Sequence, residues 1–192
     1  MVDAGAWCSW LNEHHEDSDG VWLVLGKKGK AGPTTLSYDE ALEAAICFGW
    51  IDGQRRSQDD VTFVQRFTPR RARSPWSKRN VGIAERLIGD KRMQPAGLLE
   101  VERAKGDGRW ESAYDGPATI TVPDDLAAAL DASPEAASMF KTLSSQNRYA
   151  VLYRIAAAKR ADTRARRIEQ FVSMLARGET VHPQRKPGPE DR

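Results

Sequence analysis

The sequence has few cysteines, no long apolar run and no export signal, and each absence limits the class of protein. Its 192 residues include only two cysteines, Cys8 and Cys47, which have no metal-ligand spacing. One disulfide in a chain of this length is a poor sign of secretion, so we expect two reduced, half-buried thiols. No stretch approaches the roughly 20 apolar residues of a membrane helix, and residues 1–5 lack the basic start of a signal peptide. The sequence therefore predicts a cytoplasmic protein with no membrane span.

Motifs of the common enzyme classes are also missing. The sequence contains no Gly-x-Ser-x-Gly or His-Glu-x-x-His pattern and no cysteine with an obvious histidine partner. Asp52, Ser145 and Tyr149 could form a site only if the fold brought them together, which sequence cannot show. We predict a non-enzymatic protein with no catalytic residues and no cofactor, and an enzyme that acts on an anionic substrate stays open as an alternative.

Two segments resemble a phosphate-binding loop and a metal site, but each lacks a required feature. Between Gly20 and Gly26 lie five residues, and Lys28 stands where the Walker phosphate loop requires Ser or Thr. We therefore interpret residues 26–32 as a flexible basic loop. His14 and His15 are adjacent, so on a helix they point about 100° apart and cannot chelate one metal together. We expect no metal site.

Charge is segregated along the chain, although the net charge is only +2. Residues 61–84 and residues 148–168 each carry a net charge of +6, which leaves the rest of the chain at −10. The basic residues of the first segment are Arg66, Arg70, Arg71, Arg73, Lys78 and Arg79. Such clusters produce a local field that the total charge conceals.

Hydrophobic periodicity predicts an α+β fold, with a small antiparallel sheet packed with helices and followed by a helical C-terminal region. We expect helices over residues 3–15, 38–48, 76–88 and 95–105, and strands over residues 21–25, 50–57 and 61–67. Ser37 and Glu40 form a capping box before the second helix. After residue 123 the pattern is purely helical. Asp124 caps the first of these helices, Ser133 starts the second, and Ser144 or Ser145 starts a third that runs to Lys159. A fourth shows Ile168, Phe171, Val172 and Leu175 on one face.

The domain prediction follows from these elements. We expect an α+β domain over residues 1–115, a helical subdomain over residues 124–180, and a disordered tail over residues 182–192, which is rich in proline and charge.

The segment rich in tryptophan and arginine, residues 48–80, is the candidate ligand site. Arginine offers a planar fork of donors for phosphate or carboxylate and stacks on aromatic rings, and serines before a helix add donors for an anion. We assign the predicted ligand-binding role to Trp50, Asp52, Arg55, Arg56, Arg66, Arg70, Arg71, Trp76, Ser77, Lys78 and Asn80. In this hypothesis Asp52 orients Arg55 or Arg56. In the other interpretation, Trp50 and Trp76 are core residues and the arginines pair with acids.

The partner class also has alternatives. Aromatic residues interleaved with arginine suit single-stranded nucleic acid, yet the isoelectric point of 8.6 is below the values above 9 that are typical of dedicated nucleic-acid binders. Concentrated charge favours an anionic small molecule or an acidic protein surface. The second basic cluster is either a solvated face or a partner surface continuous with the first. It consists of Arg154, Lys159, Arg160, Arg164, Arg166 and Arg167.

Several motifs carry a family resemblance. They are residues 48–56 (FGWIDGQRR), 65–71 (QRFTPRR), 74–80 (SPWSKRN), 108–110 (GRW) and 143–149 (LSSQNRY). Together they resemble the bacterial YdeI/OmpD-associated (OmdA, "bacteriocin-protection") family over nearly the whole chain up to about residue 182. The resemblance implies a link to resistance against bacteriocins or antimicrobial peptides, a porin association and a periplasmic site, which does not match the missing export signal. It brings no catalytic residues.

Such proteins are grouped with YjbR/CyaY-like domains, which also include frataxins. That grouping implies an antiparallel sheet packed against the N-terminal helix, and it suggests iron or nucleic acid as ligands to test. An iron site would use the carboxylates near the first helix, which are Glu13, Glu16, Asp17 and Asp19. The function hypothesis is a binding module of this family for an anionic ligand or acidic partner, with a nucleic-acid-binding protein as the alternative. The sequence predicts no oligomeric state.

Overall fold

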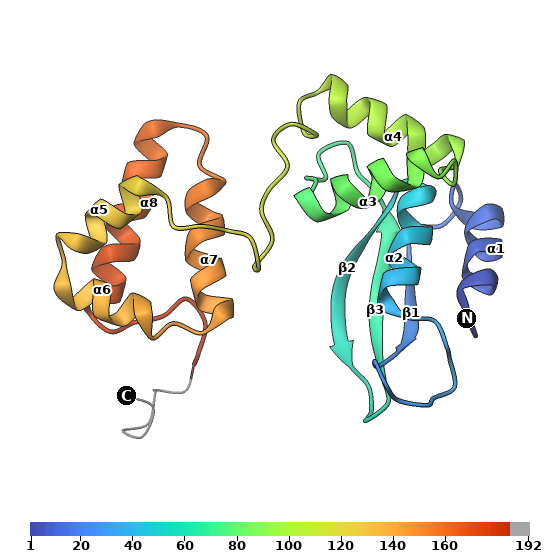
Figure 1. Ribbon diagram of the computed structural model, residues 1–192, viewed down its shortest axis with the longest axis horizontal. Coiled ribbons are helices and arrows are strands. Elements are labelled where there is room, and N and C mark those ends of the chain that lie inside the picture. Colours follow the sequence, from blue (N-terminus) through green and yellow to red (C-terminus); the bar gives the residue numbers. More distant parts are fainter. Residues whose placement is uncertain (185–192) are drawn as a thin grey trace. The chain divides into compact units, whose positions relative to one another are not determined.

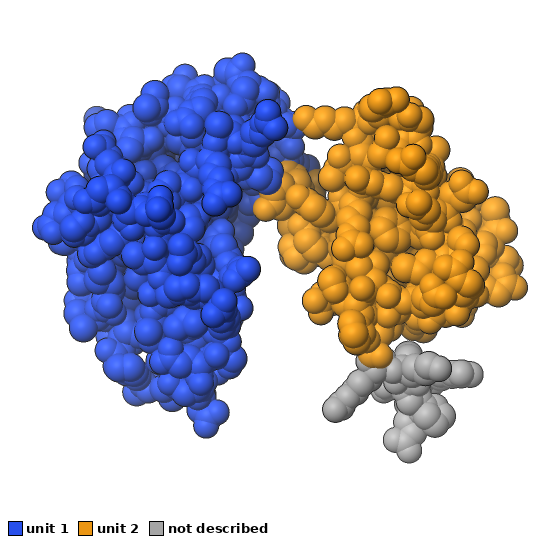
Figure 2. All heavy atoms as spheres, turned by 180° about the vertical axis from the view of Figure 1, so that it is seen from behind, with its two compact units in different colours: residues 1–113 blue, residues 114–192 orange. Residues whose placement is uncertain are grey.

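The computed structural model describes residues 1–184, and the chain divides into two compact units (Figure 2). Unit 1 comprises residues 1–113, and unit 2 starts at Tyr114. Residues 185–192 of the predicted tail lie outside the described residues.

Unit 1 has the predicted α+β fold (Figure 1). Its elements are α1 (Ala4–His14), β1 (Val21–Gly26), α2 (Tyr38–Cys47), β2 (Trp50–Ser57), β3 (Thr62–Pro69), α3 (Lys78–Gly89) and α4 (Pro95–Gly106). The strands form an antiparallel sheet in the order β1-β3-β2. Helix α2 lies across the sheet, and α3 and α4 lie at the end where β2 begins (Figure 1).

Local signals position the helix ends. The capping box before α2 is present as expected, because Ser37 accepts from the Glu40 N–H and the Glu40 carboxylate accepts from the Ser37 N–H. Gly49 has a φ of +74°, which glycine adopts without strain, and it turns the chain from α2 into β2. Helix α3 begins at Lys78 and not at Trp76, because Ser77 has extended backbone and caps the helix through its hydroxyl.

Alternation along β3 defines the two faces of the sheet. Phe63, Gln65 and Phe67 are buried, whereas Val64 and Arg66 are only partly buried. The strand therefore has one buried face and one partly exposed face. We call the side with the buried residues the core face and the other side the open face.

The core of unit 1 is built around tryptophan rings on the core face. Trp7 of α1 lies edge-on to Trp50 with ring centroids 6.2 Å apart and also contacts Phe67 at 5.8 Å. Both indole N–H groups are satisfied, since Trp7 donates to the Ala41 carbonyl and Trp50 donates to the His15 carbonyl, each over 3.1 Å. This packing places α1 against the sheet domain, as the sequence predicts.

Helix α4 approaches the end of α2 at backbone contact distance. The Gln94 N–H donates to the Cys47 carbonyl over 3.0 Å, and Gly97 is buried directly beside it. A methyl group added at Gly97 would lie 2.2 Å from the Cys47 oxygen and 2.8 Å from the Ile46 oxygen. Only glycine therefore fits this contact.

Unit 2 consists of four described helices around a second apolar core. They are α5 (Asp124–Asp131), α6 (Pro134–Lys141), α7 (Ser145–Ala156) and α8 (Ala161–Ala176). Three sequence-based details differ. Asp124 is the first helical residue and Pro123 holds the cap position, α7 ends at Ala156 and not at Lys159, and part of the predicted tail is bound to α7.

The contact between residues 182–184 and α7 centres on Asn147, which is 1% exposed. Its side chain accepts from the His182 N–H over 2.8 Å and donates to the His182 carbonyl over 3.0 Å. It also donates to the Gln184 side chain over 2.8 Å. Residues 182–184 are therefore attached to the unit 2 core and do not begin a free tail.

The described residues also bear on membrane insertion and on the state of the two thiols. Within residues 1–184, no helix has both the length and the apolar character that crossing a membrane requires. Both cysteines are free thiols, with Cys8 exposed and Cys47 buried. Burial raises the pKa of Cys47 to about 11, so this thiol stays protonated at neutral pH.

The Gly97 contact gives a stability prediction. We expect Gly97→Ala to destabilise unit 1 by about 2 kcal/mol, because backbone atoms must move to admit the methyl group. Urea unfolding followed by tryptophan fluorescence measures this, since all six tryptophans lie in unit 1. The control is Gly82→Ala in α3, where a methyl group meets no atom within 4 Å. It should stabilise the unit by about 0.5 to 1 kcal/mol, and equal effects of the two substitutions would contradict the assignment.

Candidate functional site

The segment rich in tryptophan and arginine divides between the core and the surface. Trp50 is 1% exposed, Trp76 is 2% exposed, and Asn80 is also buried. Ser77 is occupied as the cap of α3, where its hydroxyl accepts from the Asn80 N–H over 3.2 Å. These residues support the fold, which agrees with the interpretation of the tryptophans as core residues.

An aromatic–arginine stack lies on the open face of the sheet. The guanidinium carbon of Arg56 lies 4.4 Å from the centroid of the Trp22 ring, and that of Arg66 lies 5.9 Å from it. Trp22 pairs with Arg66 across β1 and β3, and Arg56 pairs with Val64 across β2 and β3. All three side chains therefore project on the same side. We call Trp22, Arg56 and Arg66 the sheet-face stack.

Sequence reasoning missed Trp22, although the signal was present. Residues 21–25 are all apolar, so no polar residue marks the exposed positions of this strand. Leu23 and Leu25 are buried, while Trp22 and Val24 are partly exposed. Period-two alternation applied to this strand would have placed Trp22 opposite the core.

Asp52 and Arg55 lie on the core face instead. A bulge in β2 places Gly53 and Gln54 between them, so these residues share a face although they are three apart. The Gln65 amide fills the bulge by donating to the Gly53 carbonyl over 2.8 Å and to the Gln54 carbonyl over 3.2 Å. Arg55 lies over the Phe63 ring at 3.8 Å, on the other side of the sheet from the sheet-face stack.

Asp52 bonds to a tyrosine and does not orient an arginine in the way that the sequence hypothesis proposed. The Tyr38 hydroxyl of α2 donates to the Asp52 carboxylate over 2.9 Å. Arg79 of α3 donates to the same hydroxyl over 3.4 Å and pairs with Asp39 at 2.7 Å. Burial and the nearby Asp52 charge raise the pKa of Tyr38 to about 12. Tyr38 therefore remains a hydrogen-bond donor at neutral pH and links α2 to β2.

A second stack is buried after β3. Arg70 is 7% exposed and its guanidinium carbon lies 3.7 Å from the centroid of the Trp76 ring. Trp76 in turn contacts Trp110 with ring centroids 4.9 Å apart. Arg109 connects this loop to α4, because it donates to the Ser74 carbonyl over 3.0 Å and to the buried Glu100 carboxylate over 2.9 Å. The GRW motif at residues 108–110 thus holds the loop in place.

Arg71 and Lys78 are exposed beside this loop. The Arg71 N–H donates to the Ser74 hydroxyl over 3.0 Å, which closes the turn between them. Among the assigned basic residues, Arg56, Arg71 and Lys78 are thus exposed and lie off the core face, and Arg66 lies partly buried on the open face.

The basic cluster of unit 2 is partly neutralised within its own fold. Arg164 makes two hydrogen bonds to the Asp125 carboxylate, at 2.5 and 2.8 Å, and a third to the Ile155 carbonyl at 3.1 Å. Arg160 pairs with Asp162 at 2.8 Å, and Arg167 donates to the Arg154 carbonyl. These contacts stabilise the ends of α7 and α8.

Metal ligation has no support in the described part of the chain. Residues 1–184 contain no group of three or more His, Cys, Asp or Glu side chains that could hold a metal ion. The carboxylates near α1 instead lie close to histidines, as in the 3.5 Å contact between His14 and Asp17.

Comparison with family models assigns the two parts of the chain separately. Residues 1–100 match the family described as Domain of unknown function (DUF8412), and residues 119–178 match the family described as Bacteriocin-protection, YdeI or OmpD-Associated (OmdA). The chain belongs to the DUF8412 family and carries an OmdA domain. No curated protein and no solved structure matches it.

The OmdA match confirms the family resemblance and locates it in unit 2. Of the motifs that suggested the family, only residues 143–149 lie inside the matched range. Residues 48–80 lie in the DUF8412 match, so the sheet-face stack belongs to that domain. The OmdA name therefore says nothing directly about the arginine-rich surface.

The buried stack gives a prediction that separates Arg70 from its neighbour. We expect Arg70→Ala to destabilise unit 1 by about 2 kcal/mol, because a desolvated cation–π contact and the packing of its aliphatic stem are both lost. Arg71→Ala is the matched control and should change stability by less than about 0.5 kcal/mol. Urea unfolding followed by tryptophan fluorescence compares them. If Arg70→Ala left stability unchanged, the stack would not hold the loop.

The Tyr38 pKa gives a pH prediction. The phenol has an ordinary pKa of 10.0 and a folded-state pKa of about 12, so above pH 10 the unfolded state loses its proton first. The stabilisation is complete below pH 10 and is lost as the pH rises toward 12. Tyr38→Phe should remove this part of the alkaline loss of unit 1 stability, measured by tryptophan fluorescence in urea. Tyr38 is the single tyrosine of unit 1, and identical alkaline profiles for the two proteins would refute the shift.

Proposed function

We propose that the protein is a non-enzymatic binding module whose sheet-face stack binds an anionic ligand or an acidic partner. The observation that carries this proposal is that Arg56 and Arg66 both lie over the ring of Trp22 on the open face. A guanidinium that lies over an aromatic ring still has the N–H donors of its edge available for an oxyanion. Because the contact already restricts the side chain, binding loses less conformational freedom.

The chemistry of the ligand follows from these donors. Two guanidinium groups near one ring can each bind a carboxylate or phosphate through paired N–H donors. The surrounding chain adds to the field, since residues 61–84 carry a net charge of +6. An oxyanion with at least two negative charges fits this surface best. The description of the OmdA family as bacteriocin-protection motivates the further proposal that this binding contributes to resistance against bacteriocins or antimicrobial peptides.

A nucleic-acid-binding protein is the second candidate, and the partly exposed Trp22 between two arginines favours it. Nucleotide bases stack on such rings while the phosphates contact the arginines. Salt dependence separates the candidates, because the affinity for a nucleic acid falls steeply with salt as counterions are released.

Binding measurements test the proposal with three probes: tripolyphosphate, a poly-glutamate peptide and single-stranded DNA. Arg56→Ala combined with Arg66→Ala should weaken binding of the preferred probe by at least about tenfold, as expected for the loss of charge-assisted hydrogen bonds. Arg55→Ala is the control, because Arg55 lies on the same strand and carries the same charge but faces the core side. Equal weakening by Arg55→Ala would show that diffuse charge, and not the sheet-face stack, binds the probe.

A further inference from the structure

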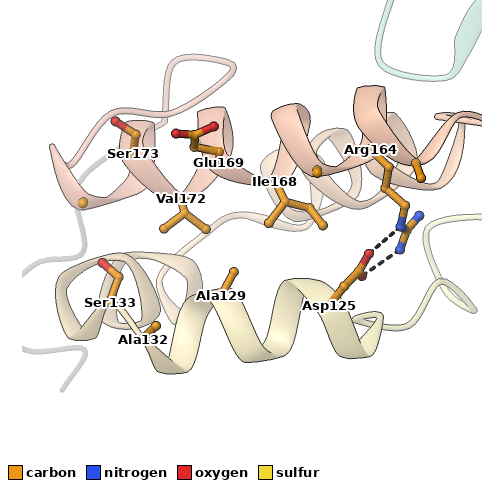
Figure 3. Close-up of a pocket in the computed structure, with 12 residues that line it drawn as sticks. Asp125, Ala129, Ala132, Ser133, Arg164, Ile168, Glu169, Val172 and Ser173 are labelled. Atoms are coloured by element: carbon orange, nitrogen blue, oxygen red, sulfur yellow. Dashed lines mark hydrogen bonds and ion pairs between the residues drawn. The ribbon is translucent and has the colours of Figure 1, made fainter.

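A groove lined mainly by apolar side chains lies between α5 and α8 of unit 2. Its volume is about 690 Å³, within the range of ligand sites. Ile168 and Val172 of α8 point toward α5, which contributes Asp125 and Ala129 to the lining and is followed by Ala132 at its C-cap (Figure 3). Alanines on α5 leave this space open beside the larger side chains of α8.

The groove follows the helix axis of α8. Its lining along this helix recurs every three or four residues, from Ala161 through Ala165, Ile168 and Val172 to Ala176. The 16 residues of α8 span about 24 Å, or more than four turns. A stripe of this length and spacing matches the apolar face of another helix, which places anchors at i, i+3, i+4 and i+7.

The chemistry of the lining also selects a helix over an extended peptide. An extended segment in an apolar groove leaves backbone N–H and C=O groups without partners, and each such buried group is costly. A helix satisfies its backbone internally. The apolar lining is therefore suited to an occupant that brings only side chains.

Charge further restricts the occupant. Asp125 and Arg164 neutralise each other at one end of the groove through two hydrogen bonds of 2.5 and 2.8 Å (Figure 3). Glu169 is exposed on the α8 side, and α5 carries the exposed Asp124 and Asp131 and no basic residue. Within the lining, the charge left over from this pair is that of Glu169, and the α5 edge of the groove is acidic, whereas the exposed Arg166 lies on α8 outside the lining.

We propose that the α5–α8 groove binds a cationic amphipathic α-helix of a partner polypeptide, with its apolar stripe between Ala129 and Val172 and a basic residue opposite Glu169. A second copy of this chain fits less well, because its own groove is equally hollow and presents the same Glu169. This site lies in unit 2 and does not depend on the anion site of unit 1.

Fluorescence anisotropy with a labelled synthetic peptide of about 15 residues tests the proposal. The probe carries leucine and alanine at i, i+3, i+4 and i+7 and lysine elsewhere. A scrambled peptide of the same composition, which lacks the apolar stripe, should bind at least about tenfold more weakly. Ala165→Glu places a charge in the groove at an exposed helical position. It should lower the affinity for the probe by a similar factor. Circular dichroism confirms that the variant stays folded.

A charge exchange provides the sharper readout. Glu169→Lys should lower the affinity for the lysine probe and raise the affinity for a matched probe in which glutamate replaces lysine. General destabilisation of the protein cannot produce these opposite effects. Gln170→Lys adds a positive charge at the next residue, outside the lining, and should affect both probes much less. Equal effects of the two substitutions would overturn the proposal.

Two other results would also overturn it. One is the absence of binding by the wild-type protein at about 1 mM probe, because the affinity would then be lower than that of a specific docking site. The other is a concentration-dependent dimer in sedimentation velocity that Ala165→Glu abolishes, because the groove would then be an interface between two copies.

Discussion

The burial of one face of β3 is the constraint on which unit 1 depends. Phe63, Gln65 and Phe67 must lie under the helices, and a slip of one residue would exchange them with Val64 and Arg66. The core therefore determines the register of the sheet, and the register determines what appears on the open face. Trp22 and Arg56 are brought to Arg66 from strands on either side of β3. The candidate site is thus a consequence of packing on the opposite side of the sheet.

Burial distinguishes two uses of the same contact in this protein. Arg70 on Trp76 and Arg56 on Trp22 have similar geometry, with guanidinium carbons at 3.7 and 4.4 Å from the ring centroids. The first is enclosed by Trp110 and the loop that Arg109 holds, so its main effect is on stability. The second is exposed, so its donors can reach a ligand. Composition alone cannot separate these roles, because both pairs occur in one basic segment.

Sequence reasoning predicted the elements well and the site only in part. Strand alternation and the capping box at Ser37 are local, and the structure confirms both. The division of the arginines between the faces is not local, since it depends on the bulge between Asp52 and Arg55. A bulge shifts the parity of every later residue in the strand. Arg55 and Arg56 therefore could not be assigned to a face before the pairing of β2 with β3 was known.

The near-neutral total charge conceals local clusters of both signs in each unit. Basic side chains collect on the open face of unit 1, while the acidic side chains of α5 and Glu169 border an apolar groove in unit 2. Each unit matches a different family model, DUF8412 in the first and OmdA in the second. Residues 1–113 contain 17 basic and 17 acidic residues, and residues 114–192 contain 12 and 10, so the total charge of neither unit distinguishes the two surfaces. Each surface stands on its own compact core, and the local charge at the sheet-face stack or at Glu169, rather than the net charge of the unit, would select its proposed partner.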